Sequence, residues 1–136
     1  KAQASATGSR SIALGDNAIA ANNYSTALGK SASATGISSL AIGSTSAQTS
    51  ATGTASAAIG ANSGTAGSKA SGSGAMALGG SYASGADSFA AAIASNASSY
   101  GATGGNSLAM GFRSKANGLY GVAVGHQKRP LLCGSG

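Results

Sequence analysis

A short pattern of apolar and small residues recurs along the chain. It consists of an apolar residue, Ala, a second apolar residue and Gly, as in Ile12-Ala13-Leu14-Gly15. Some copies replace an apolar residue by Thr or Ala, and one copy, at 91–94, ends in Ala instead of Gly. Eight copies end at positions 15, 29, 43, 60, 79, 94, 111 and 125, so the intervals between successive copies are 14, 14, 17, 19, 15, 17 and 14. The pattern indicates a fourteen-residue repeat with insertions.

A second pattern, Ala-x-Gly, lies between the copies of the first, as in Ala34-Thr35-Gly36. In one copy Asn22 replaces the Gly. The second pattern ends seven residues before the end of the next apolar pattern in seven of eight units, the exception being the nine residues from Gly85 to Ala94. The insertions therefore fall mostly in the other half of the unit, at 44–52, 61–73 and 95–103. The second of these can be aligned through Gly72 or through Gly67, and the spacing does not choose between them.

Two halves of seven residues predict two short strands and two tight turns per unit. About five residues form each strand and about two are left for each turn. Gly, or Asn at position 22, is expected to close each half because a corner favours a residue that accepts a positive φ. A helix is a poor alternative, because a Gly every seven residues would destabilise it by about 1 kcal/mol each time.

The alternation of side chains along a strand assigns faces to the first half. Ile12 and Leu14 share one face, and Ala13 points to the other. Stacking the units aligns the central Ala residues into one row and the Ile, Leu, Met and Val residues into another. In this alignment the Ala row contains Ala13, Ala27, Ala41, Ala58, Ala77, Ala92, Ala109 and Ala123. Only one row can fill a thin coil. The other must face outward, and so long an apolar stripe is expected to be buried against identical chains.

The second half has a different character. In residues 30–36, Ala32 and Ala34 share a face, whereas Ser31, Ser33 and Thr35 occupy the other. This half therefore has one solvated face, and the sequence predicts one sheet buried on both sides and one buried on a single side.

Composition supports a thin solenoid over an ordinary globular fold. The chain has 32 Ala, 25 Ser and 23 Gly among its 136 residues, but only 18 Leu, Ile, Val and Phe, too few for a core of ordinary thickness. No run of about 18 apolar residues is present, so direct membrane insertion is not expected. Residues 1–4 lack the apolar stretch of a signal peptide, and the single Cys133 excludes an intramolecular disulfide framework.

The repeats resemble a known family. Residues 11–18, 39–46 and 106–111 resemble the head repeat of YadA-like trimeric autotransporter adhesins, a repeat that also occurs in bacteriophage tail fibres. The resemblance covers residues 5–126. It implies a left-handed parallel β-roll with fourteen residues in each turn, associated as a tight homotrimer. The insertions and Ala94 depart from the family pattern, and no neck, stalk or membrane anchor is recognisable. We assign residues 1–125 to the head repeats and 126–136 to a C-terminal cap or connector.

No catalytic constellation is visible, and neither an enzyme nor a cofactor is expected. Asp16 and Asp87 are the only acidic residues and lie five units apart, which argues against paired-carboxylate chemistry. His126 is the only His and has no acid near it in sequence, so a His-dependent triad is improbable and an exposed residue at the end of the last turn is expected. A metal site would require His126 or Cys133 to converge from three chains on an axis, and none is predicted.

Two further motifs have simpler explanations. The Gly-rich stretch 64–74 contains Lys69, but no Gly-Lys-Ser/Thr follows and no strand–helix context surrounds it, so a loop insertion is favoured over a phosphate-binding site. Thr7, Thr35, Thr52 and Thr103 could form a ladder of the kind that binds ice. Only four of the eight units carry Thr at that position, which makes ice binding a minor alternative.

The net charge of +6 suggests a weak attraction to anionic glycans or cell surfaces, although solubility alone is the simpler explanation. Nucleic-acid binding is not expected, because Tyr24, Tyr82, Tyr100 and Tyr120 are not interleaved with a dense basic stripe.

Two functional classes remain. The first is a non-enzymatic adhesin head on the bacterial surface, anchored through a part absent from this chain, which binds host extracellular matrix or cell-surface receptors. The second is a tail-fibre segment of a virion, acting as a spacer or a receptor-binding element. A C-terminal membrane barrel in the full-length protein would indicate the first, and a virion-attachment domain the second.

The last residues depart from both patterns. The repeat stops at Gly125, and Pro130 cannot donate a hydrogen bond to a central strand. We expect residues 126–133 to leave the roll and cover its end with Leu131 and Leu132, because an open solenoid end exposes apolar side chains and strand edges.

Overall fold

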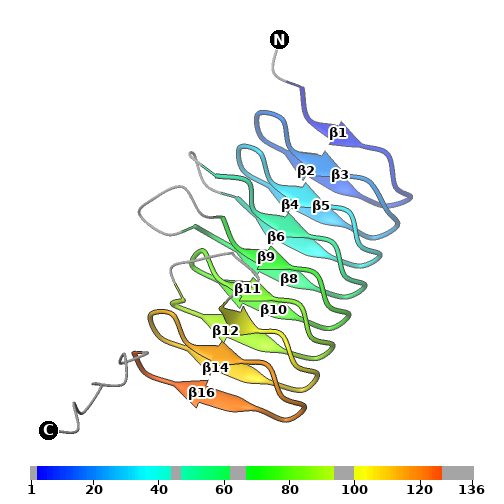
Figure 1. Ribbon diagram of the computed structural model, residues 1–136. Helices are drawn as coiled ribbons and strands as arrows, with labels where there is room; N and C mark the ends of the chain where they lie inside the picture. The colour runs from blue at the N-terminus through cyan, green and yellow to red at the C-terminus, as the bar shows by residue number, and fades with distance from the viewer. Residues whose placement is uncertain (1–2, 44–46, 62–66, 94–99, 127–136) are drawn as a thin grey trace, which may run out of the picture.

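The computed structural model describes residues 3–43, 47–61, 67–93 and 100–126, and these form strands and turns without a helix. Two-residue strands alternate with three-residue strands along the chain (Figure 1). The odd-numbered strands are β1 (Ser5–Ala6), β3 (Ile19–Ala20), β5 (Ser33–Ala34), β7 (Ser50–Ala51), β9 (Lys69–Ala70), β11 (Tyr82–Ala83), β13 (Gly101–Ala102) and β15 (Lys115–Ala116). The even-numbered strands are β2 (Ile12–Leu14), β4 (Thr26–Leu28), β6 (Leu40–Ile42), β8 (Ala57–Ile59), β10 (Met76–Leu78), β12 (Phe89–Ala91), β14 (Leu108–Met110) and β16 (Val122–Val124).

The strands form two parallel sheets, which makes the chain a β-solenoid. All odd strands lie in one eight-stranded sheet and all even strands in the other, each in sequence order. The register pairs residues one repeat apart, such as Leu14 with Leu28 and Leu28 with Ile42. The two sheets face each other, and β1 and β16 lie at opposite ends of the stack (Figure 1). The predicted all-β roll, with two strands and about fourteen residues in each turn, is confirmed, while its handedness stays a prediction.

The strands are shorter than the expected five residues because the corners of a unit of basic length use four-residue turns. At the corner after the odd strands, Ser11 N donates to Gly8 O at 3.2 Å, and Ser39 N donates to Gly36 O at 3.3 Å. The corner after the even strands is built in the same way, with Ala18 N donating to Gly15 O at 3.3 Å. Two such turns per repeat leave two or three residues for each strand.

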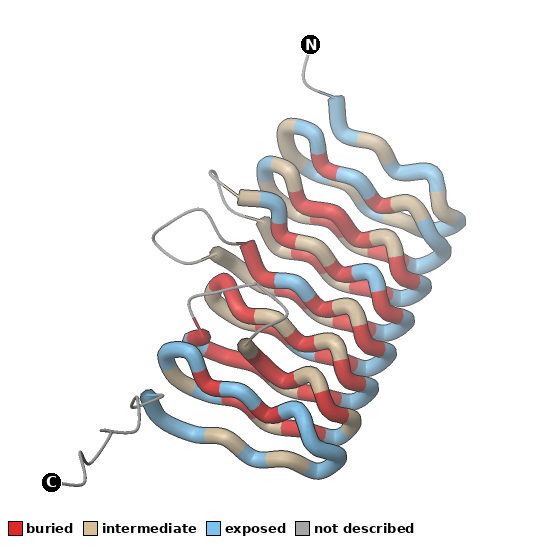
Figure 2. Tube along the Cα trace, in the orientation of Figure 1, coloured by how far each residue is buried: buried red, intermediate tan, exposed pale blue. Residues whose placement is uncertain are grey.

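The interior is made almost entirely of alanine. The central residue of the even strands points inward, and Ala27, Ala41 and Ala58 are fully buried. The second residue of the odd strands faces it, as with the fully buried Ala34 and Ala51. Figure 2 shows buried positions along both sheets between the terminal turns, whose strands β1, β2 and β16 have none. The side chains left for the outer surface are therefore the Ile, Leu, Met and Val row, which answers the question that the repeat pattern left open.

Serine hydroxyls complete the interior at one corner. The hydroxyls of Ser25, Ser39 and Ser56 each donate to the carbonyl oxygen three residues earlier, at 2.6 to 2.7 Å. The same bond recurs at Ser88 and Ser107. A buried hydroxyl without a partner would be destabilising, so this local bond is what allows a polar column inside the roll.

A positive φ was the reason expected for the glycine that closes each half. It holds at the corner after the even strands and is wrong at the corner after the odd strands. After the even strands, Gly15 and Gly111 have φ values of 130° and 102°. After the odd strands, the positive φ belongs to the residue two positions beyond the Gly, such as Ala55 after Gly53. A Cβ on Gly53 would instead lie 2.0 Å from the carbonyl oxygen of Gly72 in the next turn. Glycine at this corner is required by close stacking of the turns.

The sixth unit corrects the predicted register. The strand is β12, and Ala90 pairs with Ala77 and with Ala109, so Ala90 and not Ala92 belongs to the buried row. Ala92 takes the corner position normally held by Gly, with φ 55°. The copy assigned to 91–94 was therefore displaced by two residues. The interval between the paired positions Leu78 and Ala91 is one residue shorter than the basic repeat, because Gly79 and Gly80 make a tighter corner.

The fifth unit, which contains the second insertion, is aligned through Gly72. Lys69 pairs with Ser50 and Ala70 with Ala51, which fixes Ala70-Ser71-Gly72 as the Ala-x-Gly copy. The longer intervals of the chain connect β6 to β7, β8 to β9 and β12 to β13, so all three lie at the corner after the even strands. Residues 44–46, 62–66 and 95–99 of the predicted insertions, and the whole segment 127–136, lie outside the described residues.

Candidate functional surfaces

The outer side of the even-strand sheet is a continuous apolar surface, which we call the apolar face. It consists of the first and third residues of every even strand. At the two ends of the stack these side chains are largely exposed, with Leu14 at 69 % and Val122 at 70 %. Its members are Ile12, Leu14, Thr26, Leu28, Leu40, Ile42, Ala57, Ile59, Met76, Leu78, Phe89, Ala91, Leu108, Met110, Val122 and Val124. None of them is charged, so the face is suited to contact another apolar surface.

The outer side of the odd-strand sheet is different, and we call it the polar face. The first residues of its strands lie on this side, and Ser33 and Gly101 among them are buried: Ser5, Ile19, Ser33, Ser50, Lys69, Tyr82, Gly101 and Lys115. The Thr residues considered for ice binding follow these strands; Thr7 and Thr52 are exposed, and Thr35 and Thr103 are half-buried. Lys69 stands on β9, in a sheet and not before a helix, and residues 64–66 of the Gly-rich stretch lie outside the described residues.

Outward side chains pair between neighbouring turns. The Arg10 guanidinium lies 5.7 Å from the ring centroid of Tyr24, and its Nη1 donates to Tyr24 Oη at 3.0 Å. Lys69 Nζ lies 5.6 Å from the Tyr82 centroid, and the Arg113 guanidinium lies 5.9 Å from that of Tyr100. Such contacts are weakly attractive at exposed sites.

The linear sequence showed only that the four tyrosines are not interleaved with a dense basic stripe, and it did not predict these single pairs. Three of the four lie beside a cation, because residues about one repeat apart in sequence are neighbours in the stack. The spacing of one repeat was the signal that could have found them, and the search along the linear sequence missed it.

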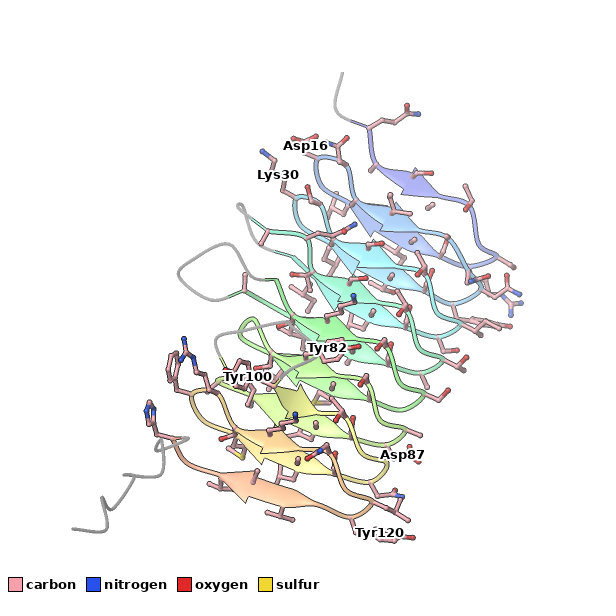
Figure 3. All side chains as sticks on the ribbon, viewed as in Figure 1. Asp16, Lys30, Tyr82, Asp87, Tyr100 and Tyr120 are labelled. Carbon is pink, nitrogen blue, oxygen red and sulfur yellow. The ribbon has the colours of Figure 1, made fainter. Side chains whose placement is uncertain are left out.

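The two acidic residues are far apart, as the sequence predicted. Asp16 lies near the N-terminal end and Asp87 at the opposite corner near the other end (Figure 3). Asp16 Oδ2 is 3.9 Å from Lys30 Nζ, while Asp16 Oδ1 is buried and has no hydrogen-bond partner. The ion pair joins two partly exposed side chains and contributes about 0–1 kcal/mol to stability. The distance between the two carboxylates gives no paired-carboxylate site.

The C-terminal end of the roll carries an open groove of about 360 Å³. It is lined by Arg113, Ser114, Lys115, Val122, Ala123, Val124, Gly125 and His126. His126 is exposed, as expected, and its ring stacks on Phe112 with a centroid distance of 5.2 Å. The groove lies where a further turn or a cap would sit. The predicted cap residues, with Leu131, Leu132 and Cys133, lie outside the described residues.

Within the described ranges, no three His, Cys, Asp or Glu side chains come together in a way that could hold a metal ion. The same part of the chain contains no helix long and apolar enough to cross a membrane.

The fold and its surfaces define a class of protein, a parallel β-solenoid built from short repeats that displays one apolar and one polar face. Residues 2–18, 6–32, 20–46 and 102–127 match the family model of the YadA head domain repeat, which spans two copies of the repeat. Together these segments cover just over half of the chain. The chain therefore belongs to the YadA head family, whose members are adhesin-type head domains. A comparison with curated proteins gave no match.

Proposed function

We propose that this chain is the head segment of a trimeric surface adhesin, which acts outside the bacterial cell and binds host matrix or cell-surface receptors. The observation that carries the proposal is the apolar face, which extends over all eight even strands. At about 4.8 Å per strand it is roughly 34 Å long. A contiguous apolar surface of this size marks an interaction site.

Identical chains are the partner that the apolar face fits best. Because the face repeats every turn, a second roll can lie against it with each even strand opposite an equivalent strand. Burial of residues such as Leu14 and Val124, both 69 % exposed in the single chain, would add apolar area to an interior that otherwise consists of Ala and Ser. Family membership supports three as the number of chains.

Receptor binding is assigned to the surfaces that association would leave open. These are the polar face, which carries Lys69, Tyr82 and Lys115, and the corner from which the longer connections leave. Connections on a rigid scaffold are common positions for binding residues. An anchor in another part of the full-length protein would hold the head at the cell surface.

The association is tested by light scattering of the wild type and two Asp variants. The wild type is expected to have the mass of three chains. Ile42→Asp places a charge in the middle of the apolar face and should dissociate the trimer. Ser50→Asp introduces the same charge in the middle of the polar face and should leave the trimer intact.

A folded wild-type monomer at micromolar concentration would contradict the trimer. Binding of the purified head to immobilised matrix or to host cells tests the adhesin role. If the intact trimer bound neither, the adhesin assignment would be wrong even though the association was right.

A further inference from the structure

Four side chains from neighbouring turns form a cluster near the C-terminal end, at the corner after the even strands. We call Tyr100, Phe112, Arg113 and His126 the Arg113 cluster. The Arg113 guanidinium carbon lies 5.9 Å from the ring centroid of Tyr100 and 5.0 Å from that of Phe112. Phe112 and His126 stack with an angle of 9° between their rings. One cation therefore lies against two aromatic rings, one of which also stacks on His126.

The cluster is accessible and held in place by the fold. Phe112 is 44 % exposed, and Arg113 and His126 are also exposed. Tyr100 is half-buried and packs against the alanine core, which fixes the base of the cluster. Phe112 and Arg113 are the two central residues of a tight turn in which Ser114 N donates to Gly111 O at 3.1 Å. The rings thus form a platform on a rigid corner.

The charge of Arg113 is not balanced within the chain. The sequence contains two acidic residues, of which Asp16 lies beside Lys30 and Asp87 stands at the other corner of the roll (Figure 3). Lys115 is also near, because Arg113, Lys115 and His126 all line the open groove of about 360 Å³. That volume lies at the lower end of the range for small-ligand sites, roughly 300–1000 Å³. The site therefore combines unneutralised positive charge with exposed aromatic rings.

We infer that the Arg113 cluster binds a carboxylate-bearing sugar unit of an acidic glycan. The planar guanidinium matches a carboxylate through two parallel hydrogen bonds, which a lysine cannot reproduce. The exposed part of Phe112 suits the C–H face of a sugar ring, which is apolar while its hydroxyls remain in water. This inference rests on the proposed adhesin function and names the chemical class of its receptor.

The test is a titration of the native assembly with hyaluronan oligosaccharides, which carry carboxylates but no sulfates. A chitin oligosaccharide of equal length serves as the neutral control. The wild type should bind the acidic sugar and not the neutral one. Arg113→Gln should weaken binding about 10- to 100-fold, the usual effect of losing hydrogen bonds to a charged group.

Arg10→Gln is the matched control variant. It removes the same charge from an arginine that also lies over a tyrosine, but at the opposite end of the roll. It should leave the affinity unchanged. Arg113→Lys keeps the charge and loses the paired hydrogen bonds, so it should also weaken binding. It also replaces Arg113→Gln if that variant fails to fold. Light scattering and thermal melting confirm that each variant keeps its assembly.

Several results would overturn the inference. An equal loss in Arg10→Gln and Arg113→Gln would mean diffuse charge attraction. Tighter binding of heparin oligosaccharides than of hyaluronan would mean that sulfate, which heparin carries beside its carboxylates, is the recognised group. Tighter binding of polyglutamate or single-stranded DNA would mean another class of ligand. A head that binds host cells but no acidic sugar would disprove this inference and leave the adhesin proposal standing. A head that binds the acidic sugar but no host cell or matrix would support the sugar site and disprove the adhesin proposal.

Discussion

Eleven non-glycine residues in the described part of the chain have a positive φ, and all of them lie at corners of the roll. A left-handed conformation costs an L-residue about 1–2 kcal/mol, because its Cβ approaches the next carbonyl oxygen. Ala55, with φ 55°, and Tyr24, with φ 60°, are two examples with no side-chain amide or carboxylate to offset this cost locally. Substitutions that relieve the strain at these corners are therefore expected to stabilise the roll.

Ala55→Gly is expected to stabilise the fold by about 1 kcal/mol, because glycine adopts a positive φ without strain. Ala55 is exposed, so the change removes little packing. Thr54→Gly alters the neighbouring exposed residue, which lacks a positive φ, and should be neutral or destabilising. Denaturant unfolding of both variants measures the difference. Equal effects at the two positions would show that strain at residue 55 is not what limits stability.

The stacked glycines lead to a second prediction at this scale. Gly53→Ala should destabilise the roll by about 1–3 kcal/mol, because its Cβ would lie 2.0 Å from Gly72 O and the turns would have to separate. Gly118→Ala is the control from the same column, since a Cβ there has no atom within 4 Å. Thermal melting should show a clear loss for the first variant and little change for the second. Similar losses would point to the flexibility of glycine in general and not to stacking.

At the scale of elements, the two corners of each turn have different tolerance for change. The corner after the odd strands keeps a constant length, and its glycines stack with little space between turns. The corner after the even strands carries all the longer intervals and also the shortened one at Gly79 and Gly80. One edge of the roll therefore sets the stacking, and the other accommodates changes in length.

Deleting three residues from the segment 44–52 should leave the roll folded. The deletion reduces the interval between the paired residues Ile42 and Ile59 to that of the basic repeat. A matched deletion of three residues from 30–36 would make an interval of basic length shorter than any turn in the stack, and should prevent folding. Circular dichroism and melting curves distinguish the two. Loss of structure in the first variant would show that this interval is required for folding.

The sequence predicted the elements well because a β-solenoid encodes its fold locally. A fourteen-residue repeat, an alternating Ile-Ala-Leu strand and a glycine at each corner were enough to give two parallel sheets. The sixth unit was misassigned because residues 91–94 resemble the apolar pattern as closely as residues 89–92 do. Only the pairing of Ala90 with Ala77 and Ala109 distinguishes them. The role of the odd-corner glycines also required contacts between turns, which no single unit contains.

The surfaces were predicted less completely than the fold. The apolar row was found, but its orientation depended on whether Ala or Ile fills the space between the sheets. The Arg113 cluster was missed because its members are distant in sequence and meet only through stacking. Tyr100 and Arg113 are separated by about one repeat, and so are Phe112 and His126. Comparing outward positions one repeat apart would have found both pairs.

At the scale of the whole molecule, stability depends on how the ends of the stack are covered. Each turn contacts only its neighbours, so the terminal turns have half the contacts of the inner ones. At the C-terminal end, β15 and β16 have no following strand among the described residues, and the groove beside them exposes Val122 and Val124. This end is the place where additional chain is expected to pack.

Changing both Leu131 and Leu132 to Ser should lower the melting temperature by a few degrees or promote end-to-end association. The physical reason is the loss of apolar side chains expected to cover the C-terminal turn. Changing Ser135 to Ala in the same tail is a control that should have no effect. Melting and light scattering measure the two outcomes. If the double variant changes neither, residues 126–133 lead to another domain and do not cap the roll.

The direction of the hydrogen bonds has a mechanical consequence. Backbone bonds such as Gly29 N to Leu14 O join successive turns, so they run along the axis that connects the two chain ends. Tension between an anchored base and a bound receptor acts along this axis. It would load one turn at a time, as in unzipping, instead of shearing many bonds together. Three rolls packed along their apolar faces would resist such peeling, because each turn would also have to separate from the two other chains of the trimer. Lateral packing would thereby determine how much force the filament withstands.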